Sequence, residues 1–275
     1  MKYIKNKIID SSREILQIIS LIACFIFPRV VNLSEIIRTI LGGENPNFET
    51  AKYYYLMLSG NWTIGFLVAL YVLFNFFRKS NKEIILNKGN IYHKHSYAWY
   101  WFCSKILGYE KCSLILVPIF MQFKLVLKDT FKEYPLDNSF FPEKECEVQI
   151  IKNIDNDKAI FEEVNLVIED TYPIQDSQIP RNNVDLNVIK IKRISEKIGK
   201  RVYCRTFVDS IVEIIRELPE GTILNIFATT NPKHTYEIAK KGISLAERSN
   251  IKRVNIFQQK GNGKREFENK KNKVL

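Results

Sequence analysis

Residues 53–77 read YYYLMLSGNWTIGFLVALYVLFNFF, a run of 25 residues without a charged side chain. A helix rises about 1.5 Å per residue, so this run reaches roughly 37 Å, which exceeds the bilayer hydrocarbon thickness of about 30 Å. Tyrosines stand at its start, and Arg78 and Lys79 follow its end, as is typical of residues at the membrane interface. We therefore predict a transmembrane helix here.

A second apolar stretch lies upstream at residues 15–33 and reads ILQIISLIACFIFPRVVNL. Gln17, Pro28 and Arg29 interrupt it, but the stretch can cross a membrane if Arg29 extends to the interface. A signal peptide is the alternative, because three lysines lie within the first seven residues. No small-x-small cleavage site comes after it, so we predict a second span.

The charges around the two stretches predict their orientation. The loop between them is close to neutral, whereas lysines and arginines flank the pair on the outside. The positive-inside rule then predicts a two-span hairpin with its amino and carboxyl termini in the cytoplasm. Two helices cannot enclose a channel, so a pore would require a homo-oligomer. The polar residues within the spans indicate either such a pore or helix–helix packing.

The composition excludes several classes of protein. The chain has 275 residues, 46% hydrophobic and 26% charged, which is incompatible with a fully disordered or collagen-like chain. The five cysteines are widely spaced without a CxxC pair, so we expect free thiols in a reducing compartment and neither a disulfide framework nor a zinc module. His93 and His95 form a His-x-His pair, but no acidic or Cys ligand lies near in sequence. We predict no metal and no cofactor.

Beyond the hairpin (residues 1–80), residues 81–110 read as a connector with an aromatic helix over 96–107 that ends at Gly108. Apolar runs and helical spacing then alternate, which favours an α/β domain over 111–260 with a parallel sheet covered on its faces. A charged tail, 261–275, is expected to fray. The predicted strands are 114–120, 165–171, 188–194, 222–230 and 253–257, with 201–204 a short strand or helix lead-in; the predicted helices are 207–218 and 231–250.

Polar residues follow the clearest strand, and ligands in open α/β sheets bind at strand carboxyl ends. Thr229, Thr230 and Asn231 offer hydroxyls and an amide, and Lys233 and His234 follow at the start of a predicted helix. Helix amino termini favour anions, so these five residues form a candidate phosphate site. Ordinary capping by Thr230 or Asn231 is the alternative. The loop lacks the glycines of a Walker loop or a dinucleotide fingerprint.

A second polar strand end carries Glu169, Asp170 and Tyr172. The two acids could hold a ribose hydroxyl or a base amine, and Tyr172 could stack on a base. A solvated turn is the commoner outcome, and a catalytic carboxylate pair is disfavoured because strand neighbours point to opposite faces. A basic cluster either meets phosphates or anionic lipid or is a solvated face; it consists of Lys190, Lys192 and Arg193 on one strand and Lys200 and Arg201 after it.

Residues 207–257 resemble the ligand-binding half of the CARF and SAVED domains, the Rossmann-like sensors of prokaryotic antiviral signalling. The resemblance lies in a strand that ends in Thr229-Thr230-Asn231-Pro232-Lys233 before a helix, although Asn-Pro replaces the family's glycines. It implies that Thr229, Thr230, Asn231 and Lys233 touch ligand phosphate or ribose. The fold class is then α/β, with two N-terminal transmembrane helices followed by a cytoplasmic Rossmann-like domain.

The whole layout is similar to membrane effectors of bacterial cyclic-oligonucleotide (CBASS-type) defence. This resemblance implies a nucleotide second messenger and a lipid bilayer as partners, homo-oligomerisation, disruption of the inner membrane and no stable nucleic acid partner. An ADP-ribose-type sensor is an alternative. A membrane-anchored nucleotide-processing enzyme with Glu169 or Asp170 as general base is another, although no catalytic signature favours an enzyme. A structural scaffold is the third. We expect Lys233→Ala to abolish ligand binding.

Overall fold

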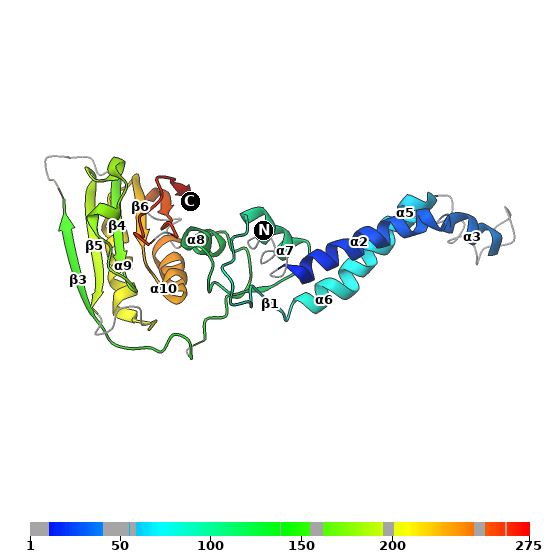
Figure 1. The fold of residues 1–275 in the computed structure, drawn as a ribbon, viewed down its shortest axis with the longest axis horizontal. Helices are drawn as coiled ribbons and strands as arrows, with labels where there is room; N and C mark the ends of the chain where they lie inside the picture. Colours follow the sequence, from blue (N-terminus) through cyan, green and yellow to red (C-terminus); the bar gives the residue numbers. More distant parts are fainter. Residues whose placement is uncertain are drawn as a thin grey trace. The chain divides into compact units, whose positions relative to one another are not determined.

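The computed structural model describes residues 11–40, 55, 59–137, 139–154, 162–194, 201–244, 251–261 and 263–275. The chain divides into two compact units (Figure 1). Unit 1 comprises Met1–Ile91 and Trp101–Lys111, and unit 2 comprises Tyr92–Tyr100 and Cys112–Leu275.

Unit 1 contains a helical hairpin. The helix α2 packs against α5, and α5 continues through the π-helical segment η1 into α6. A bend of 54° separates α2 from α3. The elements are α2 (Ser12–Val30), α3 (Leu33–Ile40), α5 (Gly60–Val72), η1 (Leu73–Phe77), α6 (Arg78–Asn81) and β1 (Ile85–Leu86). The division between the units falls within α7 (Tyr97–Lys105) and within β2 (Lys111–Cys112).

One helix in the described part of the chain, Gly60–Asn81, is long and apolar enough to cross a membrane. The bent pair α2 and α3 passes the same test only when both helices are taken as one broken span. The described helix covers the predicted 53–77 span from Gly60 onward; of the earlier residues, only Tyr55 and Ser59 are described. The structure therefore contains one clear apolar helix whose length and composition suit a membrane span.

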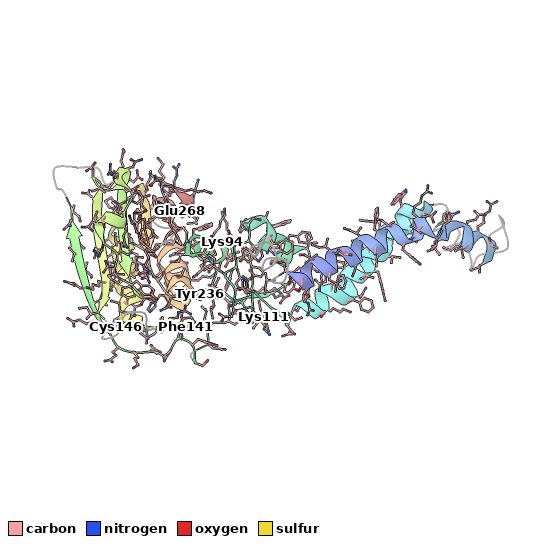
Figure 2. All side chains as sticks on the ribbon, viewed as in Figure 1. Lys94, Lys111, Phe141, Cys146, Tyr236 and Glu268 are labelled. Atoms are coloured by element: carbon pink, nitrogen blue, oxygen red, sulfur yellow. A yellow bond between two sulfur atoms is a disulfide. The ribbon has the colours of Figure 1, made fainter. Side chains whose placement is uncertain are left out.

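Side chains project outward along α2 and α5 (Figure 2). The hairpin exposes many of its apolar side chains and buries several polar ones. Leu16 and Phe66 are 63% and 54% exposed, whereas Glu14, Gln17 and Asn61 are at most 7% exposed. This pattern is the reverse of a helix pair in water, where the apolar stripe faces the partner. It is the pattern expected when the surroundings are lipid.

A glycine sets the close approach of the two helices. A Cβ atom added at Gly65 would lie 2.0 Å from the carbonyl oxygen of Phe25, so no other residue fits without a shift of the backbone. The ring of Phe25 also contacts that of Trp62, with centroids 5.2 Å apart. Small residues at such crossings are typical of membrane helix pairs.

Polar side chains tie the hairpin at both ends. Gln17 and Asn81 exchange two amide hydrogen bonds of 2.9 and 3.0 Å, and Asn81 also donates to the carbonyl of Leu107. We call these three groups the amide clasp. At the other end, Asn61 accepts from the N–H of Ser34 at 2.8 Å and donates to Asn32 at 2.9 Å.

Unit 2 is built on a six-stranded sheet of order β3-β5-β4-β6-β7-β8. The four inner strands are parallel, and both edge strands are antiparallel to their neighbours. The fold class is thus mixed α/β, and the expected parallel sheet is confirmed for its inner part alone. The strands are β3 (Glu147–Asn153), β4 (Glu163–Glu169), β5 (Asn187–Ile194), β6 (Thr222–Ala228), β7 (Ile251–Phe257) and β8 (Asn272–Lys273).

Helices and loops bury the two faces of the sheet. The helix α9 buries its apolar stripe and packs closely on η4, where a Cβ on Gly242 would meet Ile215 at 3.1 Å. The opposite face carries an apolar cluster made by Val167, Phe227, Phe257, Ile174 and Phe267. The helices are α8 (Ile119–Leu127), α9 (Arg205–Glu217), α10 (Pro232–Glu237) and the π-helix η4 (Ile238–Ile243), with 3₁₀ turns η2 (Asp176–Gln178) and η3 (Arg181–Asn183).

Most of the sequence-predicted elements are confirmed. They are the strands at 165–171, 188–194, 222–230 and 253–257, the helices at 96–107 and 207–218, and the short lead-in at 201–204. The predicted helix 231–250 is the α10–η4 pair as far as Ile243, and residues 245–250 lie outside the described part. The sequence pattern does not predict strand β3, because this strand lies at an edge and is exposed on both faces.

Two predicted features are wrong. Residues 114–120 are not a strand: Leu116 has a φ of +58°, and Pro118 caps α8, whose apolar residues continue at helical spacing. The carboxyl-terminal tail does not fray, because β8 pairs with β7 and the side chains of Phe267 and Val274 are buried. In both segments, contacts with residues distant in the sequence decide the conformation, and the local apolar or charged composition does not.

The expectation of five free thiols is also wrong. Cys146 and Cys204 form a disulfide that joins the segment before β3 to the start of α9. The remaining cysteines carry thiols, and Cys103 and Cys112 are buried. The spacing of the cysteines does not reveal the pair, because 58 residues separate its members in sequence.

Candidate functional site

The parallel strands bring three polar segments to one edge of the sheet. Asp170 to Tyr172 follow β4, Thr229 to Asn231 follow β6, and Gln258 and Gln259 follow β7. The chain runs from β4 to β5 on one side and then continues with β6 and β7 on the other side of β4. The strand order therefore reverses between β4 and β6, the position where open α/β sheets bind ligands.

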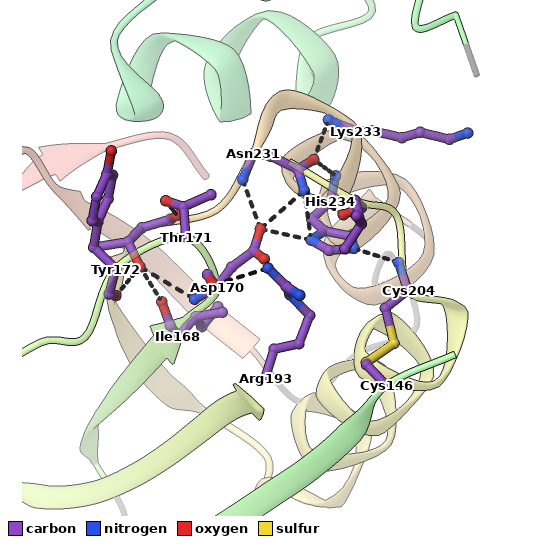
Figure 3. A network of polar contacts seen from close by, with 12 residues as sticks. Cys146, Ile168, Asp170, Thr171, Tyr172, Arg193, Cys204, Asn231, Lys233 and His234 are labelled. Atoms are coloured by element: carbon purple, nitrogen blue, oxygen red, sulfur yellow. Dashed lines mark hydrogen bonds and ion pairs between the residues drawn. A yellow bond between two sulfur atoms is a disulfide. The ribbon is translucent and has the colours of Figure 1, made fainter. Parts of the chain in front are cut away.

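The buried carboxylate of Asp170 is the centre of a hydrogen-bonded network (Figure 3). Its Oδ1 accepts from Nε of Arg193 at 2.6 Å, and its Oδ2 accepts from the backbone and side-chain nitrogens of Asn231 at 2.9 and 3.0 Å. The third partner is Nδ1 of His234 at 2.7 Å. These contacts bind the ends of β4, β5 and β6 into one assembly.

The contacts of His234 define its tautomer. Its Nε2 accepts a hydrogen bond from the backbone N–H of Cys204 at 2.8 Å, so this nitrogen carries no proton. Its Nδ1 then carries the proton that is donated to Asp170. His234 is thus a fully buried link between the carboxylate and the disulfide-bonded Cys204.

The pKa of Asp170 lies below its ordinary value. Burial alone would raise the pKa, but the hydrogen bond from His234, the charge of Arg193 and the N–H of Asn231 together outweigh it. The carboxylate is therefore ionised at neutral pH and compensated by Arg193, whose side chain is 2% exposed.

The predicted phosphate site uses most of its groups internally. The side chain of Asn231 caps α10 by accepting from the N–H groups of Lys233 and His234 at 3.0 Å each. The ammonium of Lys233 lies 4.5 Å from the ring centroid of Tyr203. The hydroxyl of Thr230 bonds that of Thr235 at 2.7 Å. The capping alternative thus accounts for the start of this helix.

Thr229 joins the two strands at which the order reverses. Its hydroxyl donates to the carbonyl of Tyr172 at 2.7 Å, and its backbone bonds Ile168 and Thr171. Beside it, Glu169 accepts from the N–H of Ile174 at 2.9 Å and pairs with Lys190 at 2.8 Å. Glu169 and Asp170 of the second predicted site therefore make structural contacts. Their cationic partners are Lys190 and Arg193 of β5.

A cavity of about 290 Å³ opens beside these strand ends; we call it the strand-end cavity. Of the predicted site residues, Tyr172, Thr229, Thr230 and Asn231 line it, whereas Lys233, His234, Glu169 and Asp170 do not. Glu169, Asp170 and Tyr172 line a separate hollow of about 300 Å³ near the end of β5. The other lining residues of the strand-end cavity are Tyr92, Leu116, Val117, Ile119, Gln122, Thr171, Arg201, Pro232, Gln258 and Gln259.

The three glutamines of this cavity are functional candidates that were not predicted from the sequence. Gln258 and Gln259 directly follow the strand predicted at 253–257, so the rule applied to the other two strand ends would have found them. Gln122 comes from α8, whose start overlaps the segment wrongly predicted as a strand. Arg201 belongs to the predicted basic cluster and provides a cation at the cavity.

The cavity provides an exposed cation, hydroxyls, amides and two aromatic rings. Burial and the negative charge of Glu268 raise the pKa of Tyr92, so its phenol is protonated and can donate a hydrogen bond. Among the described residues, no group of three or more His, Cys, Asp or Glu side chains could hold a metal ion. The arrangement fits an organic anion that carries a polar, planar group.

A hairpin that exposes apolar and buries polar side chains, in one chain with a mixed α/β unit that contains a polar cavity, is typical of a membrane-associated protein. The whole chain, residues 1–275, matches SUa-2TM, the SMODS- and ubiquitin system-associated 2TM effector domain, and the chain belongs to this family. No curated protein matches it significantly.

Proposed function

We propose that this protein is a ligand-gated membrane effector of bacterial antiphage defence, whose unit 2 senses a nucleotide second messenger. The observation that carries the proposal is the strand-end cavity, in a chain that belongs to a family of effector domains. In this proposal, unit 2 is a Rossmann-like sensor in the cytoplasm. The bound ligand contacts Thr229, Thr230, Asn231 and Tyr172 through its sugar or base.

The cation for the ligand's phosphate is Arg201 in this proposal. Arg201 lines the cavity and is exposed, so its guanidinium can bind phosphate in a bidentate way. Lys233, in contrast, lies over Tyr203 and does not line the cavity. We therefore assign the electrostatic recognition of phosphate to Arg201 and not to Lys233, the cation chosen from the sequence.

The hairpin is the effector part. Both α2 and the helix Gly60–Asn81 cross the inner membrane in this proposal, with both termini in the cytoplasm. A ligand can shift an equilibrium only by its different affinity for the two states. Binding favours a homo-oligomer, in which hairpins from several copies together breach the bilayer.

The contacts of Asp170 support a sensor over a nucleotide-processing enzyme. A general base must reach a substrate proton, and Asp170 is buried with both oxygens in hydrogen bonds to Arg193, Asn231 and His234. Glu169 is 4% exposed and paired with Lys190. Both carboxylates thus stabilise the strand ends beside the cavity in which the ligand binds.

Binding to the full chain in lipid nanodiscs tests the proposal. The panel contains cyclic dinucleotides, cyclic trinucleotides and ADP-ribose, and the readout is thermal stabilisation followed by titration. We expect a stabilising cyclic nucleotide, because a ligand that binds the folded state alone raises its stability. Arg201→Ala should weaken binding at least about ten-fold, in line with the loss of one charge-assisted contact.

The matched control is Arg205→Ala. Arg205 is also exposed and lies four residues away, but its partner is Asp209 and it does not line the cavity. Equal losses in both variants would show that general charge, and not the cavity, governs binding. A panel without any stabilising nucleotide, with the chain folded, would refute the proposal in favour of a scaffold.

A further inference from the structure

We infer that the strand-end cavity binds a nucleobase that carries an exocyclic amino group, and that three glutamine amides recognise the edge of this base by hydrogen bonds. The inference rests on the proposed function and names the part of the ligand that enters the cavity. Gln122, Gln258 and Gln259 all line it.

Each of the three glutamines holds a buried polar atom without a hydrogen-bond partner among the described residues. These atoms are Oε1 of Gln122, Oε1 of Gln258 and Nε2 of Gln259. Buried polar groups of folded proteins are nearly always paired, so each of these atoms calls for a partner that the described residues do not provide, either an ordered water or a bound ligand. Gln122, which is 4% exposed, is the most enclosed of the three.

The other ends of two amides are already engaged, which sets the direction in which they point. Nε2 of Gln122 donates to the carbonyl of Val117 at 2.7 Å, and Nε2 of Gln258 donates to the carbonyl of Gln259 at 3.3 Å. Each of these side chains therefore offers its oxygen, an acceptor, and Gln259 offers an N–H donor.

A complementary ligand edge has two N–H donors and an acceptor. Adenine and cytosine have an amino group beside a ring nitrogen, and guanine has an amino group, a ring N–H and a carbonyl. Hypoxanthine and uracil lack the amino group and offer a single N–H on the corresponding edge. Two unpaired acceptors therefore favour the amino-bearing bases, because a site built to hydrogen-bond an N–H rejects the analogue without it.

The remainder of the cavity fits the rest of a nucleotide. Tyr92 and Tyr172 line it and are 44% and 38% exposed, so their rings can stack on a base. Arg201 is the cation for the adjoining phosphate. The cavity volume of about 290 Å³ lies at the lower end of ligand pockets, which suits one nucleotide unit per copy of the chain.

Matched ligands that differ in the amino group test the inference on the full chain in nanodiscs. Affinities are measured for cyclic di-AMP, cyclic di-GMP and cyclic di-CMP against cyclic di-IMP and cyclic di-UMP. We expect the tightest amino-bearing ligand to bind at least about ten-fold more tightly than its deaminated counterpart. Gln258→Met and Gln122→Met should reduce this ratio towards one, whereas Gln149→Met, on the exposed edge strand β3, should preserve it.

The outcomes separate the inference from the proposed function. Equal affinity for both members of each pair in the wild-type chain would overturn the inference and leave nucleotide sensing intact. An unchanged ratio in both glutamine variants would overturn it as well. Absence of binding by every nucleotide would remove both the inference and the proposed function.

Discussion

At the residue scale, one ion pair determines the geometry of the strand ends. Asp170 and Arg193 are both buried, and each compensates the charge of the other at 2.6 Å. Buried pairs contribute little net stability when complete, but removal of one partner leaves an uncompensated charge. The network therefore gives the ends of β4, β5 and β6 one fixed arrangement.

Asp170→Asn should destabilise the chain by about 3–5 kcal/mol, because it leaves the Arg193 charge buried without its counterion. Chemical denaturation of the full chain in detergent measures the loss. The double variant Asp170→Asn/Arg193→Met should recover part of it. Asp176→Asn, at an exposed aspartate in η2, is the control and should be neutral. An Asp170→Asn chain as stable as wild type would contradict this account of the network.

The lowered pKa of Asp170 predicts a pH dependence of stability. The unfolded chain binds this proton more readily than the folded chain, so its contribution is complete above the ordinary value of 3.8. The contribution is lost as the pH falls through the lower folded pKa. Denaturation curves from pH 7 to pH 3 should therefore decline less steeply below about pH 4 for Asp170→Asn than for wild type. Parallel declines would refute this assignment.

The role of a residue could be predicted from the sequence only where its partner lies close to it in the chain. Thr229, Thr230 and Asn231 line the cavity as residues at a strand end should, and Asn231 caps the next helix. The engagement of Asp170 with Arg193 could not be predicted, because 23 residues separate them. The disulfide partner of Cys204 was still more distant, at 58 residues.

At the scale of elements, α2 and α5 approach closely because Gly65 has no side chain. Gly65→Ala should force the helices apart, at a cost of about 1–3 kcal/mol for overpacking. Thermal unfolding in nanodiscs measures the change. Val68→Ile adds one methyl group to an exposed position of the same helix and should have no effect. Equal midpoints for Gly65→Ala and wild type would contradict the close approach.

The amide clasp should behave as a coupled unit. Asn81→Leu leaves the buried amide of Gln17 without its two hydrogen bonds, and Gln17→Leu removes the 2.9 Å donor to Oδ1 of Asn81, which should cost about 1–3 kcal/mol in each case. The double variant removes both amides, so its loss should be smaller than the sum of the single losses by about 0.5–3 kcal/mol. A double-mutant cycle on unfolding in nanodiscs provides the comparison. Additive losses would show that the two side chains act independently.

Periodicity predicted the elements that have clear boundaries. The helix at 207–218 and the strand at 222–230 were found because apolar spacing and turn residues agreed there. Residues 114–120 failed because a short apolar run fits a strand and a helix start equally well. The exposed edge strand β3 has too little burial to leave a pattern.

At the scale of the molecule, the composition along the chain predicts an apolar amino-terminal hairpin followed by an α/β domain, and the structure contains a mixed α/β sheet. The strand order could not be predicted from sequence, since pairing across the sheet depends on contacts between distant residues. That order places the ends of β4, β6 and β7 together and so creates the cavity. The family model covers residues 1–275, so the hairpin and the α/β unit both belong to the matched effector domain.

The central claim is that a nucleotide signal received by unit 2 makes the hairpin permeabilise a membrane. The most direct measurement is dye release from phosphatidylethanolamine–phosphatidylglycerol vesicles that carry the full chain. We predict release only after addition of the cyclic nucleotide that binds best, and a loss of release in Arg201→Ala at the same ligand concentration. Intact vesicles at saturating ligand, or equal leakage with and without ligand, would contradict the account.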